Sequence, residues 1–567
     1  MTKLLLIAAS GMDWGGFDAA TRSGALPKLA ALRGRGFSGS LTGSPVGESL
    51  AAFASLATGV QPETHGIWRH QEVWGGGLRP TGRLSWRANP IWARLEAANV
   101  STGSVGWPAI APGADWPGVH LDQGFVEPTG KTAEDWALPL RCAPTGAREA
   151  IALRRVHPTQ ITTSMIQGFV PDLVAIDQTK PSQLPALAVA MARAATIQGG
   201  AVWLMSERAP QATFVFQGIL GQVRGAAESR KDPVCVHAVK AAWRFLDSLI
   251  GRLSDVAGPE ALVLVVSPGW RGRAGVVLGA GPAVRRDPDF LGGDLLDIAP
   301  TVLGFFGLED RTLTGRPLAV TPPRAACEPA PSPPLAERAK PDQDLLRIAA
   351  EDGCPPPPPA PPAWHAQGPA ELGAMLLKRA PDAAEAASAE ALRLDRDNAL
   401  ALRVRATALF ALERPELLPE MADGLERVAP NRGWGALARG AYHILRKEPN
   451  QAASWLAKAE VDPDVETLLT VAAGWLMIRN PSAAERVFKR VLEMDPANAG
   501  AEIGIAVVAM ARRDFIAAEA ALQRALAHDP ARAATYETMA KVYLETGRKT
   551  QAKRMKKIAR RLARHGF

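Results

Sequence analysis

The sequence predicts an α/β domain with a mostly parallel central sheet flanked by helices, followed by an all-α solenoid of helix pairs. Two observations predict this architecture. Continuous apolar runs alternate with helical patterns up to about residue 320, and a period of 33 to 35 residues begins near residue 370. Fifteen prolines fall between these regions, from Pro322 to Pro369. We therefore expect domains over 1–320 and 370–567, joined by a proline-rich linker over 321–369.

Four short runs in the first region are expected to be buried strands, because they are apolar throughout instead of alternating with polar residues. These runs are Leu4–Ala9, Ala201–Met205, Thr213–Phe216 and Leu262–Ser267. The helices expected between them are Leu26–Arg35, Pro90–Ala98, Leu184–Ala195 and Val236–Leu253. Strands separated by helices favour a parallel sheet that is covered on both faces.

Composition excludes several classes of protein. The chain has 567 residues, of which 47% are apolar and 22% charged, so it can fold and is not disordered throughout. No window approaches 18 uninterrupted apolar residues, which argues against a transmembrane helix. The four cysteines form no Cys-x-x-Cys pair, so a disulfide framework or a cysteine zinc site is not expected. We expect a cytoplasmic protein.

After residue 370 the chain repeats a helix–turn–helix pattern. The boundaries between repeats stand 35, 33, 33 and 34 residues apart, at Leu394-Asp395, Ala429-Pro430, Asp462-Pro463, Asp495-Pro496 and Asp529-Pro530. Proline disfavours the α conformation of the residue before it and suits the first turn of the next helix. This period is typical of tetratricopeptide repeats, about five of which would share a continuous core. We expect a protein partner to bind the concave face of these repeats.

The net charge of +8 is concentrated at the end of the chain, where residues 548–567 hold nine Lys or Arg and no Asp or Glu. The basic residues of the last helical pattern are Lys553, Arg554, Lys556, Lys557, Arg560, Arg561 and Arg564. The simplest interpretation is a helix that caps the last repeat. An anionic membrane surface or an acidic partner is the alternative, and would make the protein peripheral to the inner membrane. Nucleic acid is a weaker candidate, because no aromatic stacking residues accompany the charge.

Several sequence blocks of the first region occur together in a known family. They include Gly11-Met12-Asp13-Trp14 after the first strand, Phe53–Gly59, His65-Gly66-Ile67, and Leu296–Leu303. With these blocks the region resembles the alkaline phosphatase superfamily, in its type I phosphodiesterase and nucleotide pyrophosphatase branch. The likeness is strongest to bacterial members that carry C-terminal tetratricopeptide repeats.

The resemblance implies two divalent metals, usually zinc, held by Asp and His side chains beside a Ser or Thr nucleophile. In this chain Ser49 stands at the nucleophile position, ten residues before Gly59. The positions that match metal ligands hold other residues: Ser10, Leu220, Arg224 and Pro268. Leucine, arginine and proline side chains cannot replace carboxylate and imidazole around zinc. The resemblance therefore implies a pseudoenzyme with no cofactor, in which Ser49 is vestigial.

Two other functions stay open at this stage. The chain could be an active hydrolase of phosphodiester, phosphate or sulfate esters, using Ser49 and two zinc ions held by an unrecognised ligand set. It could also be an accessory subunit of an envelope polysaccharide or lipid-modifying system, an idea prompted only by the basic C-terminal residues.

Individual residues near the lost ligands also allow more than one interpretation. Arg224, Arg271 and Arg273 stand where metal-binding residues would be, and guanidinium groups could bind a phosphate-like anion there. A solvated loop is the simpler interpretation of the same arginines. We expect Asp13 to serve in a turn or helix cap, although it could take over the role of the lost ligand. We expect His65 to be structural, although a histidine could also act as a general base.

Overall fold

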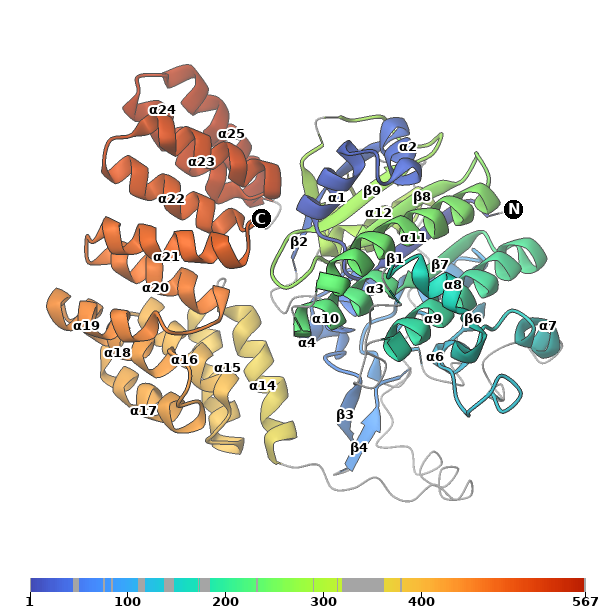
Figure 1. The fold of residues 1–567 in the computed structure, drawn as a ribbon, viewed down its shortest axis with the longest axis horizontal. Coiled ribbons are helices and arrows are strands. Elements are labelled where there is room, and N and C mark those ends of the chain that lie inside the picture. Colours follow the sequence, from blue (N-terminus) through green and yellow to red (C-terminus); the bar gives the residue numbers. More distant parts are fainter. Residues whose placement is uncertain are drawn as a thin grey trace. The chain divides into compact units, whose positions relative to one another are not determined.

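The computed structural model describes the chain except for several short segments and one long one. The described residues are 2–43, 50–74, 77–82, 85–110, 118–136, 147–171, 173, 184–230, 233–288, 290–313, 315–318, 362–377 and 380–564. The chain forms two compact units, one of residues 1–71 and 80–342 and the other of residues 72–79 and 343–567 (Figure 1). Most of the expected linker lies outside the described residues, so its boundaries remain a prediction.

The first unit is built on an eight-stranded, mostly parallel sheet, as the sequence predicts (Figure 1). Its strand order is β10-β2-β9-β8-β1-β7-β5-β6. The central strand β1 (Leu4–Ala9) pairs in parallel with β7 (Ala212–Gln217) and β8 (Leu262–Ser267). Only β9 runs antiparallel to both neighbours, β2 and β8, among the described strands. The other strands are β2 (Phe37–Thr42), β5 (Thr102–Val105), β6 (Val119–Leu121), β9 (Gly275–Ala280) and β10 (Gly292–Asp294).

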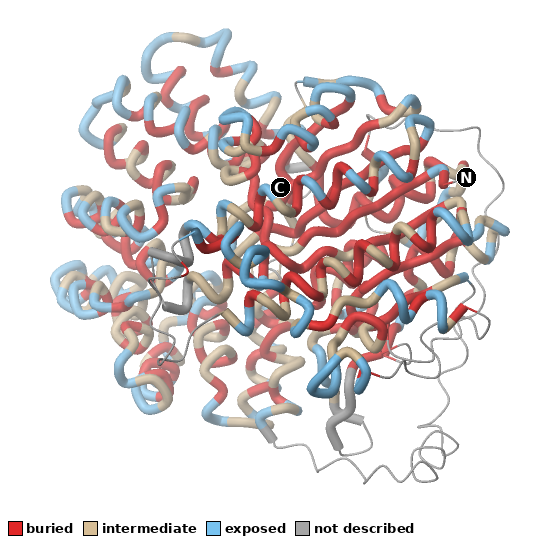
Figure 2. Tube along the Cα trace, turned by 45° about the vertical axis from the view of Figure 1, so that its right-hand side comes forward, coloured by how far each residue is buried: buried red, intermediate tan, exposed pale blue. Residues whose placement is uncertain are grey.

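Helices cover both faces of this sheet, and alternate residues of β1 belong to different cores. Leu5 and Ile7 pack with one helical layer, whereas Leu4 and Leu6 pack with the other. All residues of β1 are buried, as the continuous red trace of the sheet shows in Figure 2. The first layer contains α1 (Trp14–Arg22), α2 (Pro27–Arg35), α9 (Leu184–Trp203) and α11 (Pro233–Ala257). The second layer contains α3 (Leu50–Thr58), α5 (Ile91–Ala97) and α12 (Ile298–Phe305).

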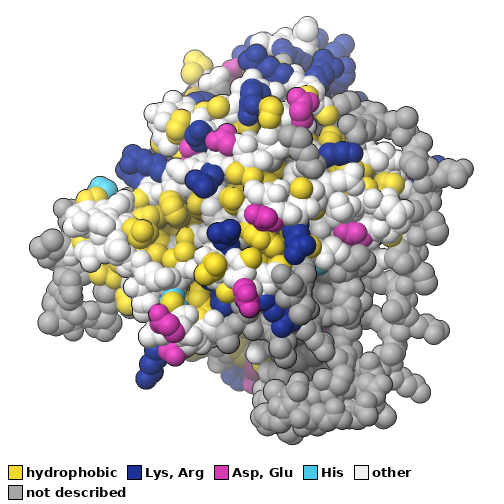
Figure 3. Space-filling view, turned by 90° about the vertical axis from the view of Figure 1, so that its right-hand side faces the viewer, with side chains coloured by type: hydrophobic (Ala, Val, Ile, Leu, Met, Phe, Trp, Pro, Cys, Tyr) yellow, Lys and Arg dark blue, Asp and Glu magenta, His cyan; other side chains and the backbone are white. Residues whose placement is uncertain are grey.

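The other helices of the first unit are α4 (Pro62–His65), α6 (Gln123–Val126), α7 (Arg148–Ala152), α8 (Thr163–Gln167) and α10 (Ile219–Arg230). Two further strands, β3 (Gln71–Trp74) and β4 (Gly77–Pro80), pair with each other, and most of their residues are assigned to the second unit. In the middle of the face shown in Figure 3, which belongs to the first unit, apolar, basic and acidic side chains are interspersed.

One expected strand is wrong. Residues Ala201–Met205 are the end of α9 and the start of a π-helical turn, Leu204–Arg208. Five apolar residues fit a buried strand and a buried helix equally well, so the run alone could not decide. The strands β2 and β5 were not predicted, because their sequences are rich in Ser, Thr and Gly and contain no continuous apolar run.

The segment Leu184–Arg208 is long and apolar enough to cross a membrane by length and composition. However, 67% of its most apolar window is buried inside the first unit. Its side chains Met191, Ile197 and Leu204 pack in the same core as β1. In the structure, this helix is buried in the way that a core helix of a folded domain is buried.

The second unit is a tetratricopeptide-type solenoid of helix pairs, as predicted from the period (Figure 1). Its helices are α14 (Pro362–Leu376), α15 (Pro381–Leu394), α16 (Ala399–Ala411), α17 (Leu418–Val428), α18 (Trp434–Leu445), α19 (Pro449–Ala459), α20 (Val465–Met477), α21 (Pro481–Met494), α22 (Ala499–Ala511), α23 (Phe515–His528), α24 (Ala533–Glu545) and α25 (Lys549–Arg564). The first of these begins at Pro362, before residue 370, and adds a helix pair to the five expected.

Alternate helices of this unit form one layer. The even-numbered helices from α14 to α24 contact one another in succession. Close packing between the layers depends on small residues. A side chain at Gly504 of α22 would place a Cβ atom 2.2 Å from the Phe488 ring of α21. Successive helix pairs are also joined by polar groups, since Arg432, before α18, donates to both carboxylate oxygens of the fully buried Asp462, before α20, at 2.9 and 3.0 Å.

Candidate functional site

The sequence positions that match metal ligands meet at one edge of the sheet. Ser10 directly follows β1, Pro268 directly follows β8, and Leu220 and Arg224 lie in α10, which begins just after β7. Because β7, β1 and β8 are adjacent and parallel, their carboxyl ends share an edge. In open α/β sheets ligands bind at that edge. That these positions form a functional site remains a prediction.

A buried ion pair occupies this edge. The Nη1 atom of Arg224 donates to Asp13 Oδ2 at 2.5 Å and to the carbonyl oxygen of Gly11 at 2.6 Å. The two side chains are only 8% and 3% exposed. The other carboxylate oxygen of Asp13 accepts a hydrogen bond from the Gly16 amide at 2.9 Å and caps α1. The expectation that Asp13 serves as a cap is confirmed, and the same carboxylate neutralises Arg224.

The other arginines of this edge surround the same group. The Arg224 guanidinium lies 5.2 Å from the centre of the Trp270 ring, and that of Arg271 lies 5.8 Å from it. Arg273 approaches Asp13 with its Nη1 atom 4.0 Å from Oδ2. The structure thus brings the three arginines together around Trp270 and Asp13. Binding of an anion by Arg224, Arg271 and Arg273 remains a prediction.

The space beside the end of β1 is filled by the protein itself. The amide of Gly221 donates to the Ser10 carbonyl oxygen at 3.1 Å. A Cβ atom at Gly221 would lie 2.0 Å from Ser10 Oγ, so α10 approaches β1 more closely than any side chain at that position allows. Leu220 is fully buried among apolar side chains.

The donor set at this edge does not fit the pair of metals that the family implies. Metals of that kind need several carboxylate or imidazole ligands around each ion. Among the described residues, no group of three or more His, Cys, Asp or Glu side chains could hold a metal ion. At the strand ends Asp13 supplies a carboxylate, and its two oxygens already serve Arg224 and the cap of α1.

His65 cannot act as a base in the observed arrangement. It is fully buried, its Nδ1 atom accepts from the Ile67 amide at 3.0 Å, and its Nε2 atom lies 3.0 Å from Ser55 Oγ. Since an amide can only donate, Nδ1 carries the lone pair and Nε2 carries the proton. Burial lowers the pKa of His65 to about 3. The histidine is therefore neutral and structural, as expected. Ser49 lies outside the described residues, one position before α3 begins at Leu50.

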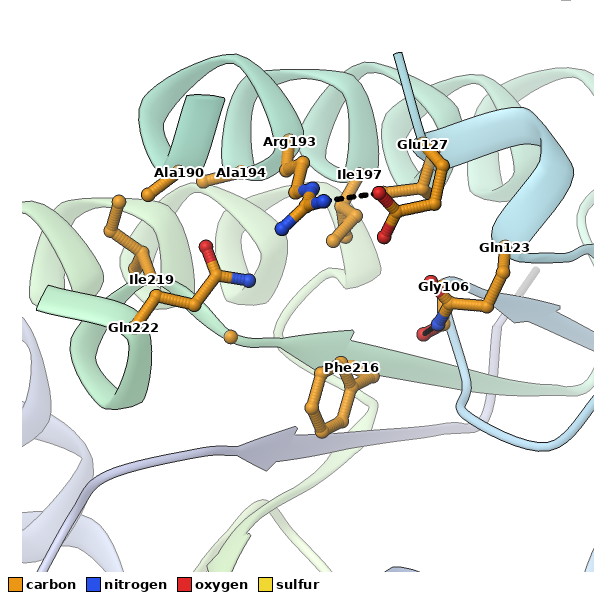
Figure 4. Close-up of a pocket in the computed structure, with 12 residues that line it drawn as sticks. Gly106, Gln123, Glu127, Ala190, Arg193, Ala194, Ile197, Phe216, Ile219 and Gln222 are labelled. Atoms are coloured by element: carbon orange, nitrogen blue, oxygen red, sulfur yellow. Dashed lines mark hydrogen bonds and ion pairs between the residues drawn. The ribbon is translucent and has the colours of Figure 1, made fainter. Parts of the chain in front are cut away.

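A small pocket that the sequence did not reveal lies at the ends of β5 and β7 (Figure 4). Its volume is about 30 Å³. Arg193 of α9 forms an ion pair with Glu127 across the pocket, and the side chain of Gln222, from α10, also lines it. The other lining residues are Gly106, Gln123, Val126, Ala190, Ala194, Ile197, Phe216, Gly218 and Ile219. No sequence motif marks these residues, which come from four separate segments of the chain.

The first unit also matches a known family by sequence. Residues 4–267 match the family described as type I phosphodiesterase / nucleotide pyrophosphatase. Over these residues the first unit is thus similar in sequence to type I phosphodiesterases. The match ends with β8, so the block Leu296–Leu303, which also carried the resemblance, lies beyond it. No curated protein matches the chain.

Solved structures similar to the chain include repeat proteins of low sequence identity. A human IFIT1 dimer with PPP-AAAA has a TM-score of 0.30 and 15% identity, and the match covers 38% of this chain and 54% of IFIT1. The chain thus spans about half the length of IFIT1. PilW, a type IV pilus biogenesis factor, has a TM-score of 0.28 and 19% identity, with coverages of 34% and 90%. A TPR protein of Thermus thermophilus has a TM-score of 0.29 and 21% identity, with coverages of 32% and 99%.

The solenoid offers a second candidate surface. Apolar residues recur at intervals of 34, 33, 33 and 34 positions near the carboxyl ends of the even-numbered helices. This apolar row consists of Phe410, Ile444, Met477, Met510 and Leu544. Met477 is 55% and Leu544 44% exposed, and the other three are half-buried. Since the helices that carry these residues contact in succession, the row follows one layer of the solenoid.

The ion pair at the strand ends makes a prediction about stability. Replacing Arg224 by Met leaves the buried Asp13 carboxylate without its partner, and we expect the free energy of unfolding to fall by about 3–5 kcal/mol. The double variant Asp13→Asn/Arg224→Met removes both charges and keeps the cap of α1, so it should recover part of the loss. Chemical denaturation measures both. Arg271→Met, at an exposed position, is the control; an equal loss there would contradict the prediction.

The lowered pKa of His65 predicts that the protein becomes less stable as the pH falls. The unfolded chain binds a proton at His65 near pH 6.5, whereas the folded chain binds it only near pH 3. The neutral ring therefore gives its full stabilisation above pH 6.5. As the pH falls from 6.5 toward 3, the free energy of unfolding decreases by about 1.4 kcal/mol per pH unit. We expect the His65 ring signals in NMR spectra to stay unchanged between pH 8 and 5. A midpoint near 6.5 in the folded protein would refute a buried neutral ring.

Proposed function

We propose that the chain is a catalytically inactive phosphodiesterase-like scaffold that acts through protein–protein interaction by its tetratricopeptide repeats. The observation that carries this proposal is the buried Asp13–Arg224 ion pair. It stands at the strand ends where the family places its metals, and it uses the carboxylate that could otherwise contribute to a metal site.

The chemistry left at this edge supports inactivity. A serine hydroxyl is a weak nucleophile unless a base or a metal activates it. His65 has its lone pair bound by the Ile67 amide, and its low pKa makes it a poor base. Guanidinium groups such as those of Arg224 and Arg273 can stabilise negative charge, but they have no acceptor atom and so cannot take the proton of Ser49. In this proposal the first unit has the fold of a hydrolase, but neither His65 nor these arginines can remove the hydroxyl proton of Ser49.

The repeats supply the binding function in this proposal. The apolar row gives the partner a series of anchoring points, since partly exposed apolar side chains gain free energy when a partner removes them from water. The partner that fits is an extended or helical segment with regularly spaced apolar side chains.

Inactivity is tested on the purified chain. We expect no stoichiometric zinc by elemental analysis, no change of Tm on addition of a chelator, and equal turnover of bis-p-nitrophenyl phosphate by the parent, Ser49→Ala and the neighbouring control Ser44→Ala. Two tightly bound metals, with a metal-dependent rate that Ser49→Ala abolishes and Ser44→Ala keeps, would instead establish an active phosphodiesterase.

The role of the apolar row is tested by comparing variants of the full chain. Once a partner has been identified, Met477→Glu/Leu544→Glu should weaken its binding at least tenfold, because two anchors acquire charge. Leu153→Glu is the matched control, since Leu153 is 82% exposed and belongs to the first unit. If the control weakens binding as much as the double variant, or if residues 1–320 alone bind the partner, the assignment of roles is wrong.

A further inference from the structure

The last helix, α25, separates its apolar and basic residues sharply. Ala552, Ala559 and Leu562 are buried, and α25 packs against α24 along this stripe. The basic residues of the opposite side are all exposed: Lys553, Arg554, Lys556, Lys557, Arg560 and Arg561. At about 100° per residue these six occupy an arc of roughly 160° on the helix. We call them the basic arc.

The charges of the basic arc are not neutralised within the described part of the chain. None of the six side chains forms an ion pair with another described residue. By contrast, Arg548, directly before α25, pairs with Glu519 at 2.8 Å. Other arginines of the same unit are paired, such as Arg524 with Glu502 and Arg439 with Asp423. α25 itself has no acidic residue. The arc is therefore a concentrated source of positive potential on one side of the solenoid.

We propose that the basic arc binds the surface of a bilayer that contains anionic lipids, and that α25 does so without inserting. Insertion of an amphipathic helix needs a free apolar face. In α25 that face is packed against the solenoid, so the attraction is electrostatic and therefore weakened by salt. This inference does not depend on whether the phosphodiesterase-like domain is active.

The shape and chemistry of the arc favour a lipid surface over other polyanions. An extended acidic peptide bound along a single helix would follow one line of side chains, whereas the arc is about 160° wide. The long side chains of Lys and Arg can bend toward a plane, so a flat, densely charged surface can reach all six. Nucleic acid would favour aromatic side chains for base stacking, and α25 contains none.

The experiment measures binding of the full chain to vesicles by co-sedimentation. The vesicles are made of phosphatidylcholine alone or with about 30% phosphatidylserine, at about 50 and 500 mM NaCl. The arc variant is Lys553→Gln/Lys557→Gln/Arg560→Gln/Arg561→Gln. The matched control, Arg396→Gln/Arg414→Gln/Arg479→Gln/Arg513→Gln, removes the same charge from exposed side chains of the same unit. The smaller variant Lys556→Gln/Arg560→Gln serves if the fourfold arc variant does not fold.

We expect binding to phosphatidylserine vesicles in low salt, a loss of at least tenfold in the arc variant and less than about twofold in the control. The smaller variant should show an intermediate loss. Equal losses in the arc and control variants would overturn the proposal, because they would reflect net charge alone. Binding to pure phosphatidylcholine, or binding that persists in 500 mM salt, would show insertion instead. Binding to poly-glutamate without binding to vesicles would assign the arc to an acidic protein.

Discussion

The parallel pairing of β1 with β7 and β8 is the constraint on which the first unit depends. It buries every residue of β1 between two helical layers, and it directs the carboxyl ends of three neighbouring strands to one edge. Whatever follows those strands must share a small volume. Ser10, Arg224 and Pro268 are far apart in the sequence, yet the sheet brings their segments together. The fold thus gathers the segments that follow these strands at the edge where open α/β sheets bind their ligands.

The Asp13–Arg224 pair connects this location to the stability of the domain. Asp13 caps α1 with one oxygen and neutralises Arg224 with the other, so the carboxylate has a structural role on each side. A buried charge without its partner is strongly destabilising. A longer side chain at position 10 would meet α10, because a Cβ atom at Gly221 would already lie 2.0 Å from Ser10 Oγ. The ion pair and the cap of α1 therefore share one carboxylate.

The sequence predicted those features that rest on strong local patterns. The strands β1, β7 and β8 are continuous apolar runs, and the solenoid follows from a repeated period, so both were found. Ala201–Met205 was misassigned because a short apolar run has no periodicity of its own, and β2 was missed because Ser and Gly dilute its pattern.

Features made by distant residues could not be predicted from local pattern. The cap formed by Asp13 was expected from its place before a helix, but its partner Arg224 is 211 positions away. The Arg193–Glu127 pocket likewise depends on tertiary packing, and neither residue stands in a motif. The tautomer of His65 follows only from the two hydrogen bonds that the fold provides.

The helix α25 shows why the same sequence pattern allows two interpretations until its packing is known. An apolar stripe beside a basic face is typical of a capping helix and of a membrane-binding helix. Both uses need the stripe, and one stripe cannot serve them at the same time. In this chain Ala552, Ala559 and Leu562 are buried against the solenoid, which assigns the stripe to the cap. The basic side chains have no such role in the fold, so the charge of α25 is available for recognition while its apolar side is not.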